Sequence, residues 1–352
     1  MQKIKISNKW IGEGEPVFII AEMSANHNQN LERAKEIIKA AAEAGADAIK
    51  LQTYTPDTLT IDCKEDSFVV KDANPDWDGK TLYDLYKTAY MSWEWYPELK
   101  KKADDCGIII FSTAYDATAV DFLEKMDVPA YKISSFETND IEFLVKIAKT
   151  GKPVIISKGM ANLEEIELAI STLRENGTKD IALLHCVSSY PAKPEDMNLA
   201  TIPDIKERFN IVSGLSDHSL GITMSAESVA FGACIIEKHF TLKRSDGGPD
   251  SSFSIEPEEL RQLVKSVREA EKAIGKVQYG VLKSELANMA GKRSLFAVCD
   301  IKAGEEFSRE NIGSIRPGYG LAPKFLPEIL GRKASADITR GTPLDWSLVA
   351  KS

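Results

Sequence analysis

The chain lacks several features that would assign it to a class at once. No stretch of about 18 apolar residues occurs, which is the length that a helix needs to cross a bilayer. The opening segment MQKIKISNKW is not followed by the apolar run of a signal peptide. Neither GxGxxG nor GxxxxGK[ST] is present, which argues against nucleotide binding. We therefore expect a cytoplasmic protein that neither spans nor binds a membrane.

Cysteine and positive charge are both in short supply. The five cysteines are odd in number and scattered, with no CxxC pair, so reduced thiols are expected. The 44 Lys and Arg residues against 53 Asp and Glu residues leave a net charge of -9. This balance disfavours nucleic acid or anionic membrane as a partner. An anionic substrate would have to be bound by a local cluster of cations.

Apolar, β-branched runs that alternate with helical segments are abundant. Strand-like runs occur at VFIIAE, DAIKLQTY, IIIFSTAY, AYKISS, PVIISKGM, IALLHCVSS, IVSGLSDH and CIIEKHF. Amphipathic segments lie between them, for example at residues 31–46, 140–151, 163–177 and 257–275, and several end in a glycine that suits a helix C-cap. Eight such units over roughly 260 residues predict an α/β fold with a (β/α)8 barrel rather than an open doubly wound sheet.

The regular alternation stops after Gly275. We predict a barrel domain at residues 1–276, a polar linker at 277–293 and a second domain at 294–352, where short β-like runs are broken at AGE, RPG and TRG. A domain of about 60 residues has a marginal core and is expected to dock on something. Residues 55–92, which contain DANPDWDG, are predicted as an insertion at the barrel end that follows the strands.

Polar side chains gather where the predicted strands end, which in a barrel is the face that carries the chemistry. They are Glu22, Lys50, Gln52, Ser112, Thr113, Lys132, Ser134, Ser135, Ser157, Lys158, Ser188, Ser216, Asp217, His218, Glu237 and His239. Two lysines and several hydroxyls in one pocket would suit phosphate and carboxylate groups together. A single strand lysine is as readily explained by a side chain that reaches solvent, but the whole set is not.

The segment AEMSANHNQ at residues 21–29 has two open explanations. A carboxylate such as Glu22 at the end of a buried strand costs desolvation unless it is paired or functional, which suggests a site. Alternatively, the segment only leads into a helix near Leu31, with Asn26, Asn28 or Asn30 as its cap.

The histidines also leave alternatives open. His218 and His239 are 21 residues apart, one βα unit, at the ends of strands expected about 4.8 Å apart. Both rings could reach one divalent ion and leave it open to water and substrate. Two histidines are also common as packing or hydrogen-bonding residues. His185 is expected in the core, and His27 either orients a neighbour or leads into a helix.

The motifs taken together resemble the sialic acid synthase family over nearly the whole chain. They are AEMSANHNQ, IKLQTY, FSTAYD, AYKISS, HCVSSYP, GLSDHSLG, EKHF and GGPDSSFSIEP. The tail, with KAGE, RPG and TRG, resembles the antifreeze-like SAF domain of that family. The resemblance thus implies a TIM barrel followed by a small C-terminal β-rich SAF domain. Within the family, AEMSANHNQ and GGPDSSFS look most like the pseudaminic acid synthases.

The resemblance implies an activity: condensation of phosphoenolpyruvate with an open-chain N-acetylated amino sugar and water, giving a nine-carbon 2-keto acid and phosphate. For the pseudaminic acid branch the sugar is 2,4-diacetamido-2,4,6-trideoxy-L-altrose. The alternative is an N-acetylneuraminate or legionaminate synthase that uses N-acetylmannosamine or a diacetamido analogue. Two rivals from other classes are a carbohydrate- or ice-binding module, suggested by the tail, and a catalytically silent scaffold barrel.

The resemblance also implies roles for individual residues. Glu22 would be the carboxylate beside the reacting carbons, and His218 and His239 would hold a divalent ion, Mn, Mg or Co. The implied phosphoenolpyruvate contacts are Lys50, Thr113, Lys132, Ser135, Ser157, Ser216 and Ser188, the last being a position where some relatives have asparagine. The implied sugar contacts are Gln52, Tyr190, Asp250 and Arg316. Since the family's tail domain covers the site of the other subunit, a domain-swapped homodimer is expected.

Overall fold

The computed structural model describes residues 3–71, 74 and 77–351. The chain divides into two compact units, residues 1–275 and 276–352. Within the described residues, no helix combines the length and the apolar character that a membrane crossing requires.

The first unit is a closed barrel of eight parallel strands, which confirms the predicted (β/α)8 fold. Around the barrel the strands follow the order β10, β3, β4, β5, β6, β7, β8, β9. Their bounds are β3 Phe18–Glu22, β4 Ala48–Thr53, β5 Ile109–Ala114, β6 Tyr131–Ile133, β7 Val154–Ser157, β8 Ile181–Cys186, β9 Val212–Asp217 and β10 Ile235–His239. Every run that the sequence marks as a strand contributes one of them.

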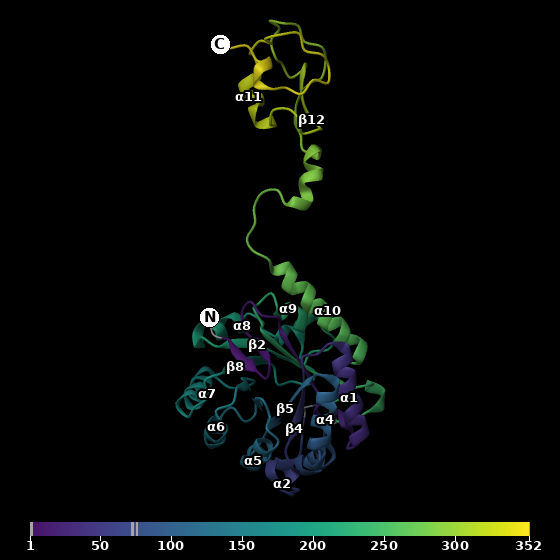
Figure 1. Cartoon of the computed structure of the whole chain (residues 1–352), viewed down its shortest axis with the longest axis vertical. Helices are drawn as coiled ribbons and strands as arrows, with labels where there is room; N and C mark the ends of the chain where they lie inside the picture. The colour runs from purple at the N-terminus through teal and green to yellow at the C-terminus, as the bar shows by residue number, and fades with distance from the viewer. Residues whose placement is uncertain (1–2, 72–73, 75–76, 352) are drawn as a thin grey trace. The chain divides into compact units, whose positions relative to one another are not determined.

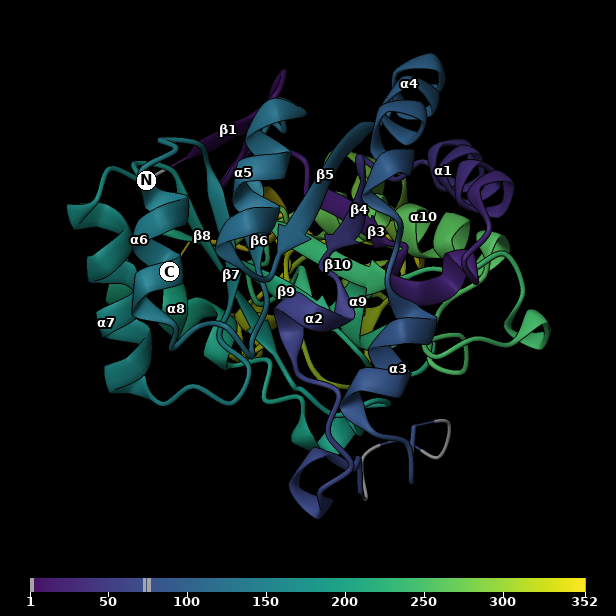
Figure 2. The same cartoon turned by 90° about the horizontal axis from the view of Figure 1, so that it is seen from below.

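A helix follows each strand and packs outside the barrel, as Figures 1 and 2 show for α1, α4, α5, α6 and α7. The helices are α1 Leu31–Ala44, α4 Tyr96–Cys106, α5 Ala117–Lys125, α6 Ile141–Ala148, α7 Leu163–Glu175, α8 Thr201–Phe209, α9 Thr223–Ser228 and α10 Pro257–Ile274. Their buried faces join the outer faces of the strands in one large apolar cluster. The amphipathic periodicity of the sequence therefore specifies which face of each helix meets the barrel.

Helix α1 shows how local sequence sets an element's ends. The Asn30 side chain accepts a hydrogen bond from the Arg33 backbone N–H (3.0 Å), so Asn30 is the cap among the three candidates. Gly45 ends the helix at φ 93°, a left-handed conformation that glycine adopts without strain. Asn26 instead donates from its amide to the Phe240 carbonyl (3.0 Å), which ties the β3–α1 loop to the end of β10.

A short antiparallel hairpin, β1 Ile4–Ile6 and β2 Lys9–Ile11, precedes the barrel. Its side chains Ile4, Ile6 and Ile11 are fully buried in the same cluster as Phe18 and Ile235, which begin barrel strands. The hairpin therefore closes the N-terminal end of the barrel. The C-terminal end of the barrel is not covered by this hairpin.

The insertion after β4 forms the helices α2 Pro56–Leu59 and α3 Leu82–Ala89, with a 3-10 turn η2 Asp66–Phe68 between them. Of the predicted segment DANPDWDG, residues 72–73 and 75–76 lie outside the described part of the chain. The Trp77 indole N–H donates to the Pro249 carbonyl (2.7 Å), in the loop that follows β10. This bond fixes the insertion over the C-terminal end of the barrel, where it was expected.

The second unit is small and poor in regular structure. Strands β11 Ser294–Ala297 and β12 Ile312–Ile315 pair antiparallel, and one short helix, α11 Leu326–Ile329, follows. The segment predicted as a linker contains a 3-10 helix, η6 Lys283–Gly291, whose residues are almost all exposed. Leu295, Phe307, Ile329 and Leu344 are among the residues of a separate buried core, so this unit has an interior of its own.

Candidate active site

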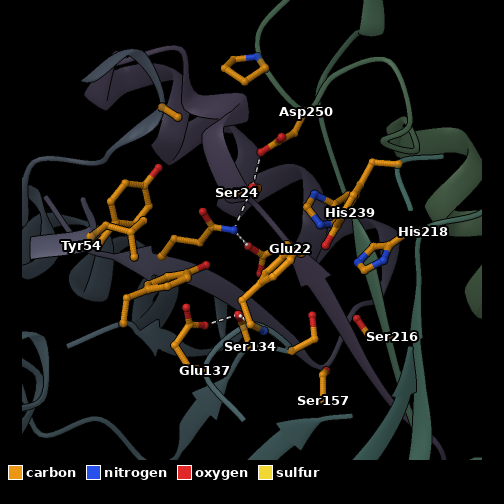
Figure 3. A pocket seen from close by; sticks show the side chains of 18 of the residues that line it. Glu22, Ser24, Tyr54, Ser134, Glu137, Ser157, Ser216, His218, His239 and Asp250 are labelled. Atoms are coloured by element: carbon orange, nitrogen blue, oxygen red, sulfur yellow. Dashed lines mark hydrogen bonds between the residues drawn. The ribbon is translucent and has the colours of Figure 1, made fainter. Parts of the chain in front are cut away.

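A pocket of about 350 Å³ opens at the C-terminal end of the barrel, within the usual size range of small-ligand sites. Strand ends supply its polar lining, and the insertion supplies an apolar side. Figure 3 shows the side chains that converge on it, with Glu22 near the centre and His218 and His239 together on one side.

Strand register brings the central residues together. Glu22, the last residue of β3, lies opposite His239 of β10 and opposite Lys50 of β4. Because neighbouring strands lie about 4.8 Å apart, this register alone places an acid, a base and an imidazole side by side. Of the two explanations of AEMSANHNQ, the structure supports both, since Glu22 lines the pocket and Asn30 caps the helix.

Two buried lysines, Lys50 and Lys132, supply the positive charge of the pocket. Lys50 contacts the Glu22 carboxylate (Nζ to Oε2, 2.6 Å) and donates to the Thr113 hydroxyl (2.7 Å). Lys132 donates to the Ser157 hydroxyl (2.7 Å). Burial opposes the charge of Lys50, but Glu22 and Glu237 outweigh it and raise its pKa. At Lys132 burial prevails and lowers the pKa.

Glu22 is almost completely buried, and burial raises its pKa to about 7 although Lys50 opposes the shift. Gln52 donates from its amide to the Glu22 Oε1 atom (3.0 Å) and to the Ser24 hydroxyl (3.0 Å). A carboxyl with such a pKa exchanges a proton readily near neutral pH, which is the property that general acid–base catalysis needs.

Glu237 is the site residue to which the sequence analysis gave no role. Its Oε1 atom lies 3.6 Å from the Lys50 Nζ and 3.8 Å from the Lys132 Nζ, and it accepts a hydrogen bond from the Ser216 hydroxyl (3.3 Å). Burial would raise the pKa of Glu237, but Lys132 and Lys50 hold it below its usual value. Glu237 therefore partly neutralises the two lysines from between them.

The remaining hydroxyls differ in how they reach the pocket. Ser157 and Ser216 line it, and so does Ser135, whose Oγ atom lies 2.8 Å from that of Ser188. Ser188 is therefore placed to orient the Ser135 hydroxyl by a hydrogen bond. Thr113 accepts a hydrogen bond from the Lys50 ammonium group and so helps to position that lysine.

Several polar strand-end residues are directed elsewhere. Ser112 hydrogen bonds Thr53 (2.7 Å) within the buried interior, and Asp217 pairs with Lys238 (2.9 Å). His185 is a core residue, as predicted: it is buried and hydrogen bonded to the Met197 carbonyl. His27 accepts a hydrogen bond from the Gln29 backbone N–H (3.0 Å), which supports its role at the start of the helical segment.

The two candidate metal ligands face each other, with ring centroids 5.4 Å apart. The His218 Nδ1–H donates to the Val187 carbonyl (2.8 Å), so its Nε2 is left as the acceptor nitrogen. Burial lowers the pKa of His239 well below its usual value, and the Nδ1 atom of this ring is buried without a hydrogen-bond partner. The His218 ring keeps Nε2 as its acceptor nitrogen, and the His239 ring has a buried nitrogen without a partner, so the two imidazoles fit a divalent cation.

The protein ligand set is small. Among the described residues no cluster of three or more His, Cys, Asp or Glu side chains is arranged to hold a metal. An ion bound by His218 and His239 would therefore take its remaining ligands from water or substrate, as in open catalytic sites. Burial opposes the charge of His218, but Cys186 outweighs it and raises its pKa.

Three of the four residues predicted to contact the sugar line the pocket: Gln52, Tyr190 and Asp250. The Tyr190 ring lies 4.3 Å from that of His218, centroid to centroid. Asp250 accepts hydrogen bonds from the Ser24 hydroxyl and the Ala25 backbone N–H (3.2 Å). The fourth, Arg316, is exposed in the second unit.

The apolar side of the pocket was not predicted. Tyr54 and Tyr115 come directly after β4 and β5. An aromatic residue one position beyond a strand end was therefore a sequence signal that could have placed these two side chains in the pocket. Leu82, Leu85 and other insertion residues carry no such signal, because nothing in their sequence shows which way the insertion folds.

Comparisons with known proteins match this geometry. A model of the NeuB family matches residues 37–279, and a model of the SAF domain matches residues 292–350. A pseudaminic acid synthase of Campylobacter jejuni is 47% identical over 93% of this chain and 95% of its own length. An N,N'-diacetyllegionaminic acid synthase of Legionella pneumophila is 38% identical, over 95% of each chain.

Solved structures agree with the same fold. The crystal structure of an N-acetylneuraminic acid synthetase from Leptospira borgpetersenii matches with a TM-score of 0.73 and 35% identity. The match covers 82% of this chain and 95% of the other.

Proposed function

Because this chain belongs to the NeuB family, which makes it a synthase-type enzyme, we propose that it condenses phosphoenolpyruvate with an N-acetylated amino sugar. Water is the third reactant, and the products are a nine-carbon 2-keto acid and phosphate. We further propose that the sugar is 2,4-diacetamido-2,4,6-trideoxy-L-altrose and the product pseudaminic acid. The 47% identity to the Campylobacter jejuni protein of that name supports this choice.

The observation that carries the proposal is the pair of buried lysines beside Glu22. Lys50 and Lys132, with the Ser157 and Ser216 hydroxyls, offer charge-assisted bonds to a phosphate and a carboxylate on one small molecule. Phosphoenolpyruvate carries both groups. Neither a carbohydrate-binding module nor a silent scaffold requires two lysines that are desolvated in this way.

The reaction forms one carbon–carbon bond and exchanges the C2–O bond to phosphate for a C2–O bond to the oxygen of water. The enol carbon of phosphoenolpyruvate attacks the sugar aldehyde, water adds at C2, and the C2–O bond breaks to release phosphate. The aldehyde oxygen gains a proton and the water loses one. Glu22, with a pKa of about 7, can hold the first proton and accept the second, and Gln52 keeps its carboxyl oriented.

His218 and His239 would hold a divalent cation, Mn, Mg or Co, next to Glu22 in the strand register. When bound, such an ion supplies Lewis-acid polarisation of the aldehyde oxygen. Tyr190, packed against His218, and Asp250, which lines the same pocket, would orient the sugar hydroxyls. In a homodimer, Arg316 of one subunit would complete the sugar site of the other.

The experiment is one incubation of phosphoenolpyruvate with each candidate sugar, followed by phosphate release and product mass. We expect the diacetamido-trideoxy-altrose to give the highest kcat/KM. A preference for N-acetylmannosamine or for the legionaminate precursor would overturn the choice of sugar and leave the condensation intact. Absence of phosphate release with every sugar, in enzyme supplied with metal, would overturn the activity itself.

A further inference from the structure

One side of the pocket is apolar and has no part in the chemistry described so far. We call it the apolar wall; its residues are Tyr54, Leu59, Val70, Leu82, Leu85, Tyr86, Ala89, Tyr115 and Phe136. They come from the loops after β4, β5 and β6 and from the insertion helices α2 and α3. Phosphate, carboxylate and metal would all be held elsewhere, so another part of the substrate must explain this surface.

The wall faces the histidines across the mouth of the barrel. In the closed order of eight strands, β5 and β6, which Tyr115 and Phe136 follow, are diametrically opposite β9 and β10, whose ends carry His218 and His239. The rest of the wall follows the neighbouring strand β4. Figure 3 shows the same arrangement, with Tyr54 on one side of Glu22 and the two histidines on the other. A substrate whose reacting end lies at the histidines therefore extends its far end toward the wall.

The wall is well packed and its own side chains are uncharged; Glu137, at its edge, lines the pocket too and accepts a hydrogen bond from the Ser134 hydroxyl. The Tyr54 ring makes edge contacts with the rings of Tyr86 (5.7 Å) and Tyr115 (5.2 Å). Burial raises the pKa of all three phenols above the usual value, so they stay neutral at physiological pH. Leu85 is buried behind them, whereas Leu82 and Leu59 are half-buried at the pocket surface. A neutral, preformed concave surface of this kind favours alkyl groups over hydroxyls.

We propose that the apolar wall binds the methyl group at C6 of the sugar, together with its neighbouring acetamido methyl, and selects 6-deoxy sugars against sugars with a C6 hydroxyl. This inference rests on the proposed function, which supplies an open-chain sugar whose aldehyde lies near His218 and His239. A six-carbon chain with its aldehyde there directs C6 to the opposite side of the mouth. The wall thus contacts the C6 end of the sugar, which the reaction leaves unchanged.

The expected selectivity is moderate. An apolar pocket discriminates one methyl-sized group or one added hydroxyl by about 10- to 200-fold in kcat/KM. We therefore expect a 6-deoxy diacetamido sugar to be preferred over its 6-hydroxy counterpart by that factor, at saturating phosphoenolpyruvate and metal.

The test is the variant Leu82→Asn, which keeps the size of a half-buried wall residue and makes it polar. We expect kcat/KM for the 6-deoxy sugar to fall about tenfold or more while that for the 6-hydroxy sugar is kept or rises. Leu59→Asn repeats the test from α2, so a local defect in α3 cannot decide the result. Leu163→Asn, at an exposed leucine of α7 outside the pocket, is the matched control and should change neither value.

Two results would overturn the inference and leave the proposed function standing. In one, the unmodified enzyme turns over both sugars with equal kcat/KM. In the other, Leu82→Asn and Leu59→Asn lower both sugars by the same factor, as a merely structural role would. If no amino sugar supports phosphate release, the proposed function is wrong. The inference about the wall is then overturned as well, because it depends on that function for its ligand.

Discussion

At the scale of single residues, the site depends on carboxyls and imidazoles whose environment changes their pKa. Glu22 has a pKa of about 7 because burial disfavours its charge, while Glu237, between two lysines, has a pKa below its usual value. The two buried carboxyls thus differ in protonation at neutral pH. From this separation we propose that Glu22 transfers protons and that Glu237 balances charge.

The variant Glu22→Gln separates chemistry from binding. It keeps the size and the hydrogen bonding of the side chain, so the chain should fold, but kcat should fall by about 100-fold or more because the exchangeable proton is lost. Steady-state phosphate release measures this. Near-normal turnover would mean that AEMSANHNQ serves only as the start of a helix.

The pH dependence of phosphoenolpyruvate binding gives the same residue a second test. Above pH 7 Glu22 becomes an anion beside the substrate's own negative charge, so its ionisation weakens binding by up to about tenfold per pH unit. Relative to the unmodified enzyme, Glu22→Gln should bind phosphoenolpyruvate equally at pH 6 and more tightly at pH 8. Calorimetry measures the binding of phosphoenolpyruvate to both proteins at pH 6 and at pH 8. At each pH the ligand has the same ionisation for both proteins, so the comparison isolates the effect of Glu22. A constant ratio would contradict the raised pKa.

The histidines lead to a prediction about metal. His218→Ala or His239→Ala should each abolish tight Mn²⁺ binding, followed by electron paramagnetic resonance, and phosphate release with it, because one imidazole is too few to hold the ion. His185→Ala, in the core, should leave Mn²⁺ affinity unchanged in the folded fraction. Full turnover by an enzyme that elemental analysis shows to be free of metal would refute the role.

At the scale of secondary structure, the sequence predicted the strands and helices whose apolar residues recur with a clear period. Eight apolar runs and the intervening amphipathic segments specified the barrel, and only the ends of the helices moved by one to three residues. The β1–β2 hairpin was missed because three-residue strands are too short to show alternation.

Strand alternation also explains which of the polar strand-end residues line the pocket. Side chains two positions apart share a face, so Ser216 and His218 point inward while Asp217 points outward. By the same rule Glu237, which the sequence already places among the strand-end residues, shares the inward face of His239. Ser112 and Thr113 are adjacent, so only one of them could reach the site side of the strand.

The outward pair Asp217–Lys238 supports the inward histidines. The two residues are register partners on β9 and β10, they are completely buried, and each directly precedes one of the histidines. Asp217 also accepts from the Ser219 backbone N–H (2.8 Å), the Ser219 hydroxyl (2.7 Å) and the Ser225 hydroxyl. The pair therefore fixes the two strand ends that carry His218 and His239.

Removing the charge of Asp217 should lower the free energy of unfolding more than removing the charge of Lys238. Asp217→Asn leaves Lys238 buried without a counter-ion, which costs about 3–5 kcal/mol of the free energy of unfolding. Lys238→Met leaves Asp217 three donors and should cost clearly less. Urea unfolding of both variants, with the exposed pair Asp204 and Arg208 mutated as a control, measures the difference. Equal destabilisation would contradict this view of the pair.

At the scale of the whole molecule, the two units differ in what sequence reasoning can say about them. The residues proposed to bind phosphate and carboxylate all come from the barrel, whose topology brings them together. Arg316 belongs to the second unit, where no strand register relates it to the pocket. Its predicted role depends on the resemblance of RPGYG to the family motif, so it needs a test that involves the complete protein.

Co-expression of two inactive chains supplies that test. In a domain-swapped homodimer, each site combines Glu22 of one subunit with Arg316 of the other. A heterodimer of an Arg316→Ala chain and a Glu22→Ala chain then has both lesions in one site and none in the other. Phosphate release per dimer should return to about half that of the unmodified enzyme, because one of two sites is intact. If Arg316 serves the barrel of its own chain, each site keeps one lesion and no activity returns in purified heterodimers. Arg309→Ala, at another exposed arginine of the second unit, is the matched control and should be active by itself.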